Sequence, residues 1–254
     1  MGHSLYLVAS ARVCQVSFYP TEKELILLRN YRQLACSAIV AISITGWAVP
    51  LAAESALNIA QLTLHKVTAT VGTHQGRAGI RIVEPGSPTL NEDKLAILPT
   101  AGFVDGTIEG WVNGSKRSDA AAGARGFIGL AFRINEDVSA FEAVYLRPTN
   151  GRADNQLRRN HTVQYFVFPE YPWHRLRAES PGKYETYADI APDTWIHFRL
   201  ELDGDTARLF LDKSEHPSFV VTDLLAEPKA GRVGFWIGPG TEAWFSDIKV
   251  MPNH

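Results

Sequence analysis

Strict alternation of apolar and polar residues in the segment WIHFRLEL, residues 195–202, is the feature that most limits the fold. Side chains in a strand alternate with a period of two, so the four residues at even positions face one side. Those four are apolar, which predicts a strand with one buried face. The following segment DGD predicts a tight turn, and ARLFLD at 207–212 predicts the second strand of a hairpin.

Similar β-rich runs follow one another along most of the chain, separated by Gly, Asp and Pro residues. They lie at 61–72, 78–84, 106–112, 126–134, 141–147, 162–168, 231–238 and 242–250. The runs at 126–134 and 141–147 are apolar on both faces, as expected for strands that are covered on both sides. Helical periodicity is weak, with one short turn expected at 221–228. This pattern predicts an all-β fold, an antiparallel β-sandwich formed by one domain.

The segment at 28–55 differs from the rest and reads LRNYRQLACSAIVAISITGWAVPLAAES. A basic start, a short apolar run and a small-residue end form the layout of a secretory signal. The apolar run is short for a membrane span, which needs about 20 residues. We expect a signal peptide here, a mature domain at 56–254 without a stable membrane span, and a periplasmic or secreted location. A buried core helix is the alternative.

Residues 1–27 precede this signal and match no element that we can assign. Secretory signals begin at their basic region, so we expect 1–27 to be an extension from a mis-assigned start. Cys14 and Cys36, the two cysteines of the chain, fall in the part expected to be removed. The mature protein would then have no disulfide and no thiol chemistry.

Arginine and aromatic residues are concentrated together at 145–177. This segment has six arginines, no lysine and two acids, although the formal net charge of the whole chain is -2. A near-neutral chain argues against a nucleic-acid partner, which normally requires a basic excess. Because the segment has few acids of its own, we expect the ligand to supply the opposite charge.

Arginine pairs bidentately with carboxylate or sulfate groups, and aromatic rings contact the apolar faces of sugars. The segment therefore predicts a surface that binds a carbohydrate ligand, especially an acidic glycan. The predicted substrate-binding residues are Tyr145, Arg147, Asn150, Arg152, Arg158, Arg159, Asn160, Gln164, Tyr171, Trp173 and Arg175. The alternative is a long connection whose arginines bind backbone carbonyl groups.

Three residues are candidates for proton transfer. If 161–168 forms a strand, His161 and Tyr165 lie on one face and could act as base and acid. Glu142 alternates with apolar neighbours, so its pKa would be raised and it could act as a general acid. The alternative for Glu142 is a buried carboxylate paired with a nearby arginine. Histidines and acids lack metal-ligand spacing, and the chain has no phosphate-binding glycine loop, so we expect neither a metal nor another cofactor.

The closing segment GRVGFWIGPGTEAWFSDIKV, residues 231–250, resembles the last two strands of the concanavalin A-like lectin/glucanase jelly rolls. WIHFRLELDGDTARLFLD resembles the preceding hairpin of that superfamily, and FVDGTIEGWV and GFIGLAFRI resemble its earlier strands. The resemblance covers about 100–250 and is nearest to secreted 3-keto-disaccharide hydrolase-like and laminin-G-like domains. It implies a jelly-roll β-sandwich.

This fold supports lectins, hydrolases, lyases and adhesive modules, so three functions stay open. The first is glycan binding. The second is an enzyme, either a glycoside hydrolase of the 3-keto-disaccharide type or a polysaccharide lyase that uses His and Tyr. The third is a protein-interaction module. The E-x-D-x-x-E strand of glucanases is missing from the sequence, and so are the ordered motifs of alginate lyases.

Overall fold

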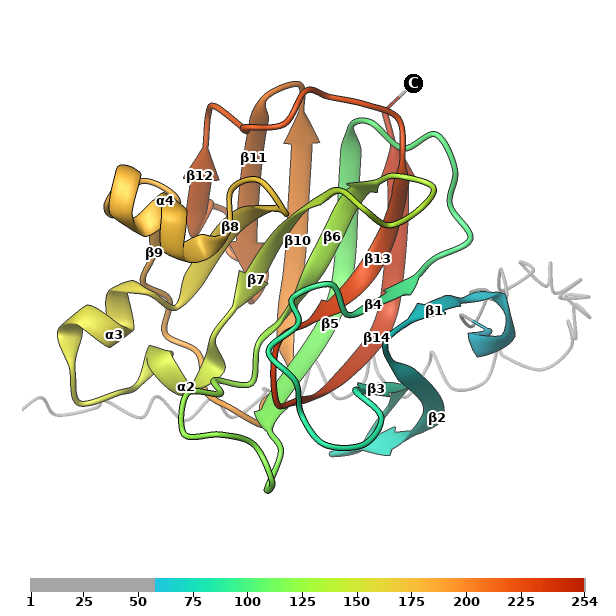
Figure 1. The fold of residues 1–254 in the computed structure, drawn as a ribbon, viewed down its shortest axis with the longest axis vertical. Coiled ribbons are helices and arrows are strands. Elements are labelled where there is room, and N and C mark those ends of the chain that lie inside the picture. The colour runs from blue at the N-terminus through green and yellow to red at the C-terminus, as the bar shows by residue number, and fades with distance from the viewer. Residues whose placement is uncertain (1–57, 254) are drawn as a thin grey trace, which may run out of the picture. The chain divides into compact units, whose positions relative to one another are not determined.

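The computed structural model describes residues 58–253, which form two facing antiparallel sheets of seven strands each (Figure 1). The expected extension at 1–27 and the expected signal at 28–55 lie outside the described residues. Within 58–253, no helix is long and apolar enough to cross a membrane. The prediction of an antiparallel β-sandwich is confirmed.

The first sheet has the strand order β1-β4-β13-β6-β7-β8-β9. Its strands are β1 (Thr63–His65), β4 (Leu95–Ile97), β13 (Arg232–Ile237), β6 (Ile128–Ile134), β7 (Phe141–Leu146), β8 (Val163–Phe168) and β9 (Glu185–Thr186). The second sheet has the order β12-β11-β10-β5-β14-β3-β2. Its strands are β12 (Phe219–Val221), β11 (Thr206–Leu211), β10 (Ile196–Asp203), β5 (Gly106–Lys116), β14 (Thr241–Pro252), β3 (Arg77–Val83) and β2 (Thr68–His74).

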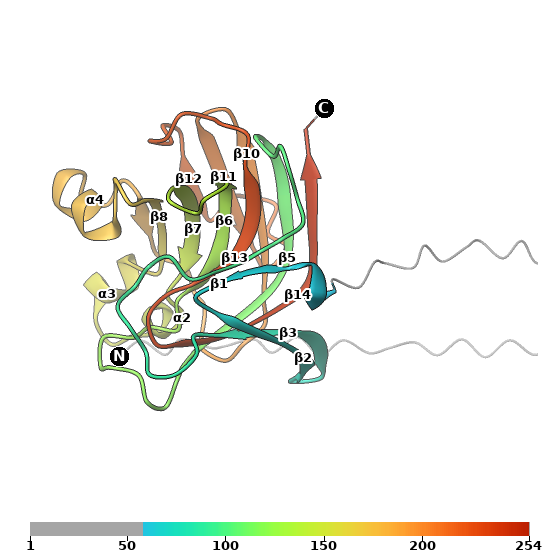
Figure 2. The same cartoon turned by 45° about the vertical axis from the view of Figure 1, so that its right-hand side comes forward.

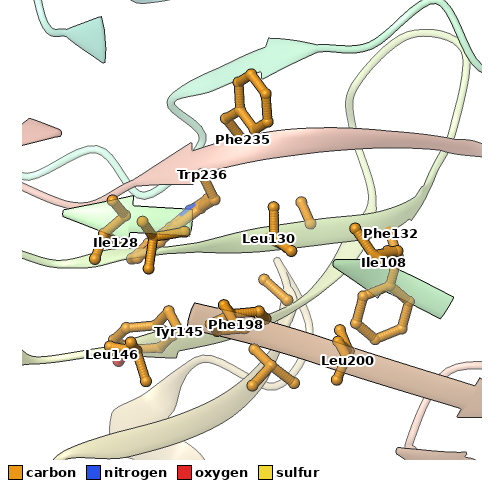
Figure 3. Close-up of a cluster of buried hydrophobic side chains, with 14 of the residues drawn as sticks. Ile108, Ile128, Leu130, Phe132, Tyr145, Leu146, Phe198, Leu200, Phe235 and Trp236 are labelled. Carbon is orange, nitrogen blue, oxygen red and sulfur yellow. The ribbon is translucent and has the colours of Figure 1, made fainter. Parts of the chain in front are cut away.

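The core lies between the two sheets and follows from the alternation of apolar residues. Phe198 and Leu200 of β10 are fully buried, and β10 pairs with β11 from Phe198↔Leu211 to Asp203↔Thr206, which confirms the hairpin. Leu130 of β6 points into the same layer, with Phe132 two residues further on (Figure 3). Burying each of these large side chains stabilises the sandwich by about 1.5–3 kcal/mol.

Strands β6 and β7 are also covered on the face turned away from the second sheet. On that outer face, Tyr145 of β7 and Trp236 of β13 lie on either side of Gly129 of β6 in the strand register. A side chain at Gly129 would meet the Tyr145 backbone at 2.6 Å. Glycine therefore lets the two rings approach to 4.6 Å between centroids. β6 and β7 are apolar on both faces because one face packs in the core between the sheets and the other packs in an aromatic cluster.

Short helices follow β7 and β8, beside those strands in both views (Figures 1 and 2). They are α2 (Pro148–Gly151), α3 (Gln156–Asn160) and α4 (Trp173–Glu179); a 3-10 turn, η1 (Ile59–Gln61), precedes β1. Pro148 is the first residue of α2. At this position the backbone N–H has no partner within the helix, so the N–H that proline lacks is not missed. The Asn155 side chain accepts a hydrogen bond from the Arg158 N–H at 2.9 Å and so starts α3. The short turn expected at 221–228 does not form a helix.

Candidate functional site

A pocket of about 1100 Å³ opens on the outer face of the first sheet. Its base is formed by side chains of β7, β8 and β13, and its walls come from three connections, at 87–92, 119–127 and 147–161, together with α4. Tyr145 and Trp236 line the base and pack against each other and against the buried Phe166, with ring centroids 4.6–5.5 Å apart. The outer face of the first sheet therefore carries a pocket with an apolar base.

Arg147 is the most deeply buried cation that lines this pocket, with 5% of its surface exposed. It follows β7 directly, so the strand fixes its position. Its Nη2 donates to the Tyr145 hydroxyl at 2.5 Å and its Nη1 to the His161 carbonyl at 3.0 Å. Both amino groups also lie 3.4 Å from the Gln164 Oε1. All of these partners are neutral, and among residues 58–253 no carboxylate forms an ion pair with Arg147. Burial lowers its pKa.

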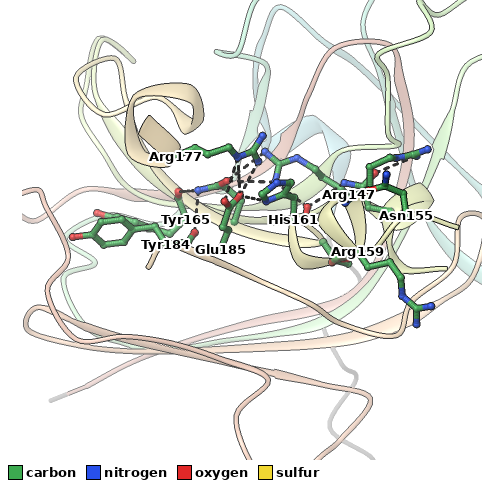
Figure 4. A network of polar contacts seen from close by, with 12 residues as sticks. Arg147, Asn155, Arg159, His161, Tyr165, Arg177, Tyr184 and Glu185 are labelled. Atoms are coloured by element: carbon green, nitrogen blue, oxygen red, sulfur yellow. Dashed lines mark hydrogen bonds and ion pairs between the residues drawn. The ribbon is translucent and has the colours of Figure 1, made fainter. Parts of the chain in front are cut away.

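His161 also lines the pocket and is positioned by a buried carboxylate (Figure 4). Its Nδ1 lies 2.7 Å from Oε2 of Glu185, whose side chain is 4% exposed. Arg177 donates to both oxygens of Glu185, at 3.2 Å to Oε1 and 2.7 Å to Oε2. Burial lowers the pKa of His161, although the Glu185 charge opposes this shift. The ring therefore lies beside the carboxylate and favours its neutral form.

Glu92 is a pocket residue that the sequence analysis missed. It lies in the connection before β4, and the Trp236 indole N–H donates to its backbone carbonyl at 2.6 Å. Burial raises the pKa of its carboxyl, against a hydrogen bond from Trp173 and the positive charges of His174 and Arg147. In the sequence, Glu92 stands in the polar run NEDK, which is typical of an ordinary surface turn.

The connection that carries Glu92 is fastened by a buried ion pair. Lys94 has no exposed side-chain surface, and its Nζ lies 3.1 Å from Oε2 of Glu84. Glu84 also accepts from the Thr89 N–H at 3.0 Å, and Lys94 donates to the Thr89 carbonyl at 2.9 Å. Burial alone would raise the pKa of Glu84, but the hydrogen bonds from Thr89 and Lys94 hold it below its ordinary value of 4.5.

This ion pair predicts a pH-dependent contribution to stability. A carboxyl whose pKa is lower in the folded state stabilises the fold above its ordinary pKa, and loses that effect as the pH falls through the folded value. We expect Glu84→Gln to lower the free energy of unfolding by about 1–3 kcal/mol at neutral pH, and by less at about pH 3. Urea unfolding at both pH values measures this. An equal loss at both would show that the Glu84 charge is unimportant.

The pocket brings together six of the residues predicted for substrate binding and catalysis. They are Tyr145, Arg147, Asn150, Arg158, His161 and Trp173. Gln164 lies behind Arg147, and its amide donates to the Tyr184 carbonyl at 2.9 Å.

The other predicted binding residues lie outside the pocket lining, and several bind neighbours on the surface. Arg152 pairs with Asp189 at 2.8 Å, Arg159 donates to the Tyr187 hydroxyl at 2.8 Å, and Arg175 pairs with Glu179 at 2.9 Å. Tyr171 lies under the Arg175 guanidinium, 4.3 Å from it, and Asn160 accepts from Gln156 at 2.7 Å. These arginines are held by local contacts, mainly with side chains and not with the backbone carbonyls of the alternative; Arg175 alone of the three also donates to a carbonyl, that of Glu170 at 2.8 Å.

The prediction that His161 and Tyr165 share one face of a strand is wrong. Strand β8 begins at Val163, and His161 is the C-cap of α3. Tyr165 points into the core between the sheets, where it is fully buried. Its hydroxyl donates to the Glu142 carboxylate and accepts from the Leu225 N–H at 3.0 Å. Burial raises the pKa of Tyr165. Tyr165 therefore faces away from the pocket.

Glu142 is also placed in the core and not in the pocket. It is 1% exposed, and its Oε1 lies 2.9 Å from Nη1 of Arg133. Burial raises its pKa, as the sequence indicated, while Tyr165 and Arg133 oppose the shift. The structure matches the alternative of a buried pair with arginine and contradicts a general acid at Glu142.

The chain was compared with family models, with curated protein sequences and with solved structures, and the solved structures are informative about the fold. No family model matches the chain, and no curated protein matches its sequence. The two facing antiparallel sheets form a β-sandwich of the jelly-roll type.

Among solved structures, the chain is similar to the carbohydrate-binding module CBM66 from Bacillus subtilis. The two are 17% identical with a TM-score of 0.50, and the match covers 74% of this chain and 93% of that chain. A protein of unknown function with a galectin-like fold, also from Bacillus subtilis, is 11% identical with a TM-score of 0.49, over 76% of this chain and 90% of that one. At 17% identity the likeness to the carbohydrate-binding module shows a shared fold alone.

Proposed function

We propose that this chain is an exported protein, periplasmic or secreted, that binds an acidic glycan in the pocket on the first sheet. One observation carries the proposal: the buried guanidinium of Arg147 faces the pocket without a carboxylate partner in the described part of the chain. A buried charge without an opposite charge is costly, and a carboxylate or sulfate of the ligand would supply that charge.

The rest of the pocket fits a sugar ring. Phe127, Trp173 and Trp236 provide apolar surface for a sugar face, while Asn150 and His161 offer groups for its hydroxyls. Arginine can pair with a carboxylate through two parallel hydrogen bonds, which fixes the orientation of the ring. The carbohydrate-binding module with the same fold supports this proposal by analogy of fold.

The test is a glycan array followed by titration of the best acidic binder. We expect the acidic glycan to bind about tenfold or more tightly than the same glycan with its carboxyl groups reduced to alcohols. Isothermal titration calorimetry measures both affinities. Equal affinity for the two forms would contradict a role for the ligand's charge.

A second candidate function is proton abstraction from the bound uronate, the reaction of a polysaccharide lyase. The pairing of His161 Nδ1 with Glu185 favours it, because the other ring nitrogen is then available as a base. Burial raises the pKa of Tyr145 to about 12, so its pocket hydroxyl stays protonated and could act as the acid in place of Tyr165. Hydrolysis would need two free carboxylates in the pocket. Of the two described lining acids, Glu92 has a pKa raised by burial, but Asp119 is paired with Arg117 at 2.7 Å.

Incubation of the best binder with the protein distinguishes binding from this reaction. Release of an unsaturated uronate, detected by its ultraviolet absorbance, is the result expected of a lyase. Binding without product would contradict the lyase for that glycan and leave the binding proposal standing.

A further inference from the structure

Two further guanidinium groups face the pocket near its rim, those of Arg125 and Arg158. The Arg125 Nη1 donates to the carbonyls of Ala122 and Ala124, at 2.7 and 2.9 Å. The Arg158 Nη2 lies 3.4 Å from the Thr149 carbonyl and 3.3 Å from the Asn150 Oδ1. All of these partners are neutral, and neither arginine forms an ion pair within residues 58–253.

The backbone holds these two arginines near each other. The Thr149 N–H donates to the Arg125 carbonyl at 3.3 Å, while the carbonyl of Thr149 accepts from Arg158. Burial lowers the pKa of Arg125, and the positive charge of Arg158 lowers it further. Two like charges that are close together in the free protein repel each other, and an anion between them would remove the repulsion.

The charges around the pocket are unbalanced even after the pairs within the protein are considered. Four arginines line it, at 125, 147, 158 and 177, against two acids, Glu92 and Asp119. Arg177 forms an ion pair with Glu185. Asp119 forms an ion pair with Arg117, a residue that does not line the pocket. Three guanidinium groups of the described pocket thus form no ion pair with a carboxylate, and Glu92 is the one described lining acid left to offset their charge. One is Arg147 at the base, and the other two form the pair at the rim.

We propose that Arg125 and Arg158 form a second anion-binding position, so that the ligand is a polyanionic glycan with acidic groups on at least two neighbouring sugars. This inference rests on the proposed function, because it takes Arg147 as the position of the first acidic group. The pocket volume of about 1100 Å³ exceeds the ~300–1000 Å³ of typical small-molecule sites and leaves room for more than one sugar ring.

The first experiment tests the second position without any sugar. Sulfate is titrated into the ¹⁵N-labelled protein, and the Nε–Hε signals of its arginines are followed by NMR. We expect the signals of Arg125 and Arg158 to shift together, and Arg158→Gln to remove the shift of Arg125. If neither signal responds, or if Arg125 responds unchanged in Arg158→Gln, the second position is contradicted. The signal of Arg147 reports separately on the first position.

The second experiment uses galacturonic acid and its trimer as probes in calorimetric titrations. We expect the trimer to bind the wild type about tenfold more tightly than the monomer, and Arg158→Gln to remove most of this difference. Arg152→Gln is the matched control, because Arg152 is an exposed arginine of the same segment outside the pocket. A trimer advantage that survives in Arg158→Gln would overturn the inference. If neither sugar binds and the Arg147 signal does not shift with sulfate, the result contradicts the proposed binding of an acidic glycan itself, and not only the second position.

Discussion

Replacement of Arg147 by methionine is expected to weaken binding of the acidic glycan by about 100-fold or more. The loss of one partner from a buried, hydrogen-bonded charge pair costs about 2–5 kcal/mol, and each 1.4 kcal/mol is a factor of about ten. Methionine keeps a long unbranched side chain, so the base of the pocket stays filled. Removal of the guanidinium relieves the cost of a buried charge without a carboxylate partner, but it also takes a donor from the Tyr145 hydroxyl and the His161 carbonyl. These two effects oppose each other, so we expect only a small net change in the free energy of unfolding.

Calorimetry of binding and thermal unfolding together test this expectation. Arg147→Lys keeps the charge but not the planar pair of donors, so it should retain only part of the affinity. Arg152→Met removes an exposed arginine outside the pocket and should bind like the wild type. Undiminished binding of the acidic glycan by Arg147→Met would contradict the site at this position.

The second large effect is expected at Glu142, and it concerns stability. Glu142→Ala leaves the Arg133 guanidinium and the Tyr165 hydroxyl without their shared partner between the sheets. Breaking such a buried pair costs about 3–5 kcal/mol, and Asp105, 2.9 Å from Arg133, should keep the loss near the lower limit. Urea unfolding of the variant measures the loss.

A triple variant provides the matched control. Glu142→Leu with Arg133→Met and Tyr165→Phe replaces the polar cluster by apolar side chains, and should recover most of the lost stability. Below their unfolding temperatures, both proteins should bind the glycan like the wild type, because the cluster faces away from the pocket. Normal stability of Glu142→Ala with lost binding or turnover would instead favour the functional role that the sequence indicated for Glu142.

The strands could be predicted from the sequence because their signal is local. In β10 (Ile196–Asp203) the alternation of apolar residues directly gave the buried face. The same rule fails at Arg133, which should point away from the core like Ala131. Arg133 has a φ of 51°, and the register of β6 against β13 shifts beside it. This irregularity directs its side chain to Glu142 on the other face, and no pattern of residue types reveals it.

The site could be predicted only in part, because its residues come from segments far apart in the chain. The excess of arginine over acid indicated 145–177, and this segment supplies Arg147 and His161 to the pocket. It could not separate them from Arg159 and Arg175, because short helices turn those side chains toward surface partners. Glu92 belongs to a distant connection, and Glu185, the partner of His161, lies on a two-residue strand. Neither position has a local signal.

The buried ion pair of Glu84 and Lys94 has a consequence for recognition. Since the wall that carries Glu92 is fastened within the folded protein, its conformational entropy is lost during folding and not when a ligand arrives. A ligand then meets a preorganised surface, and more of its contact energy becomes affinity. Association should be limited by diffusion and charge attraction, without a slow rearrangement of this wall.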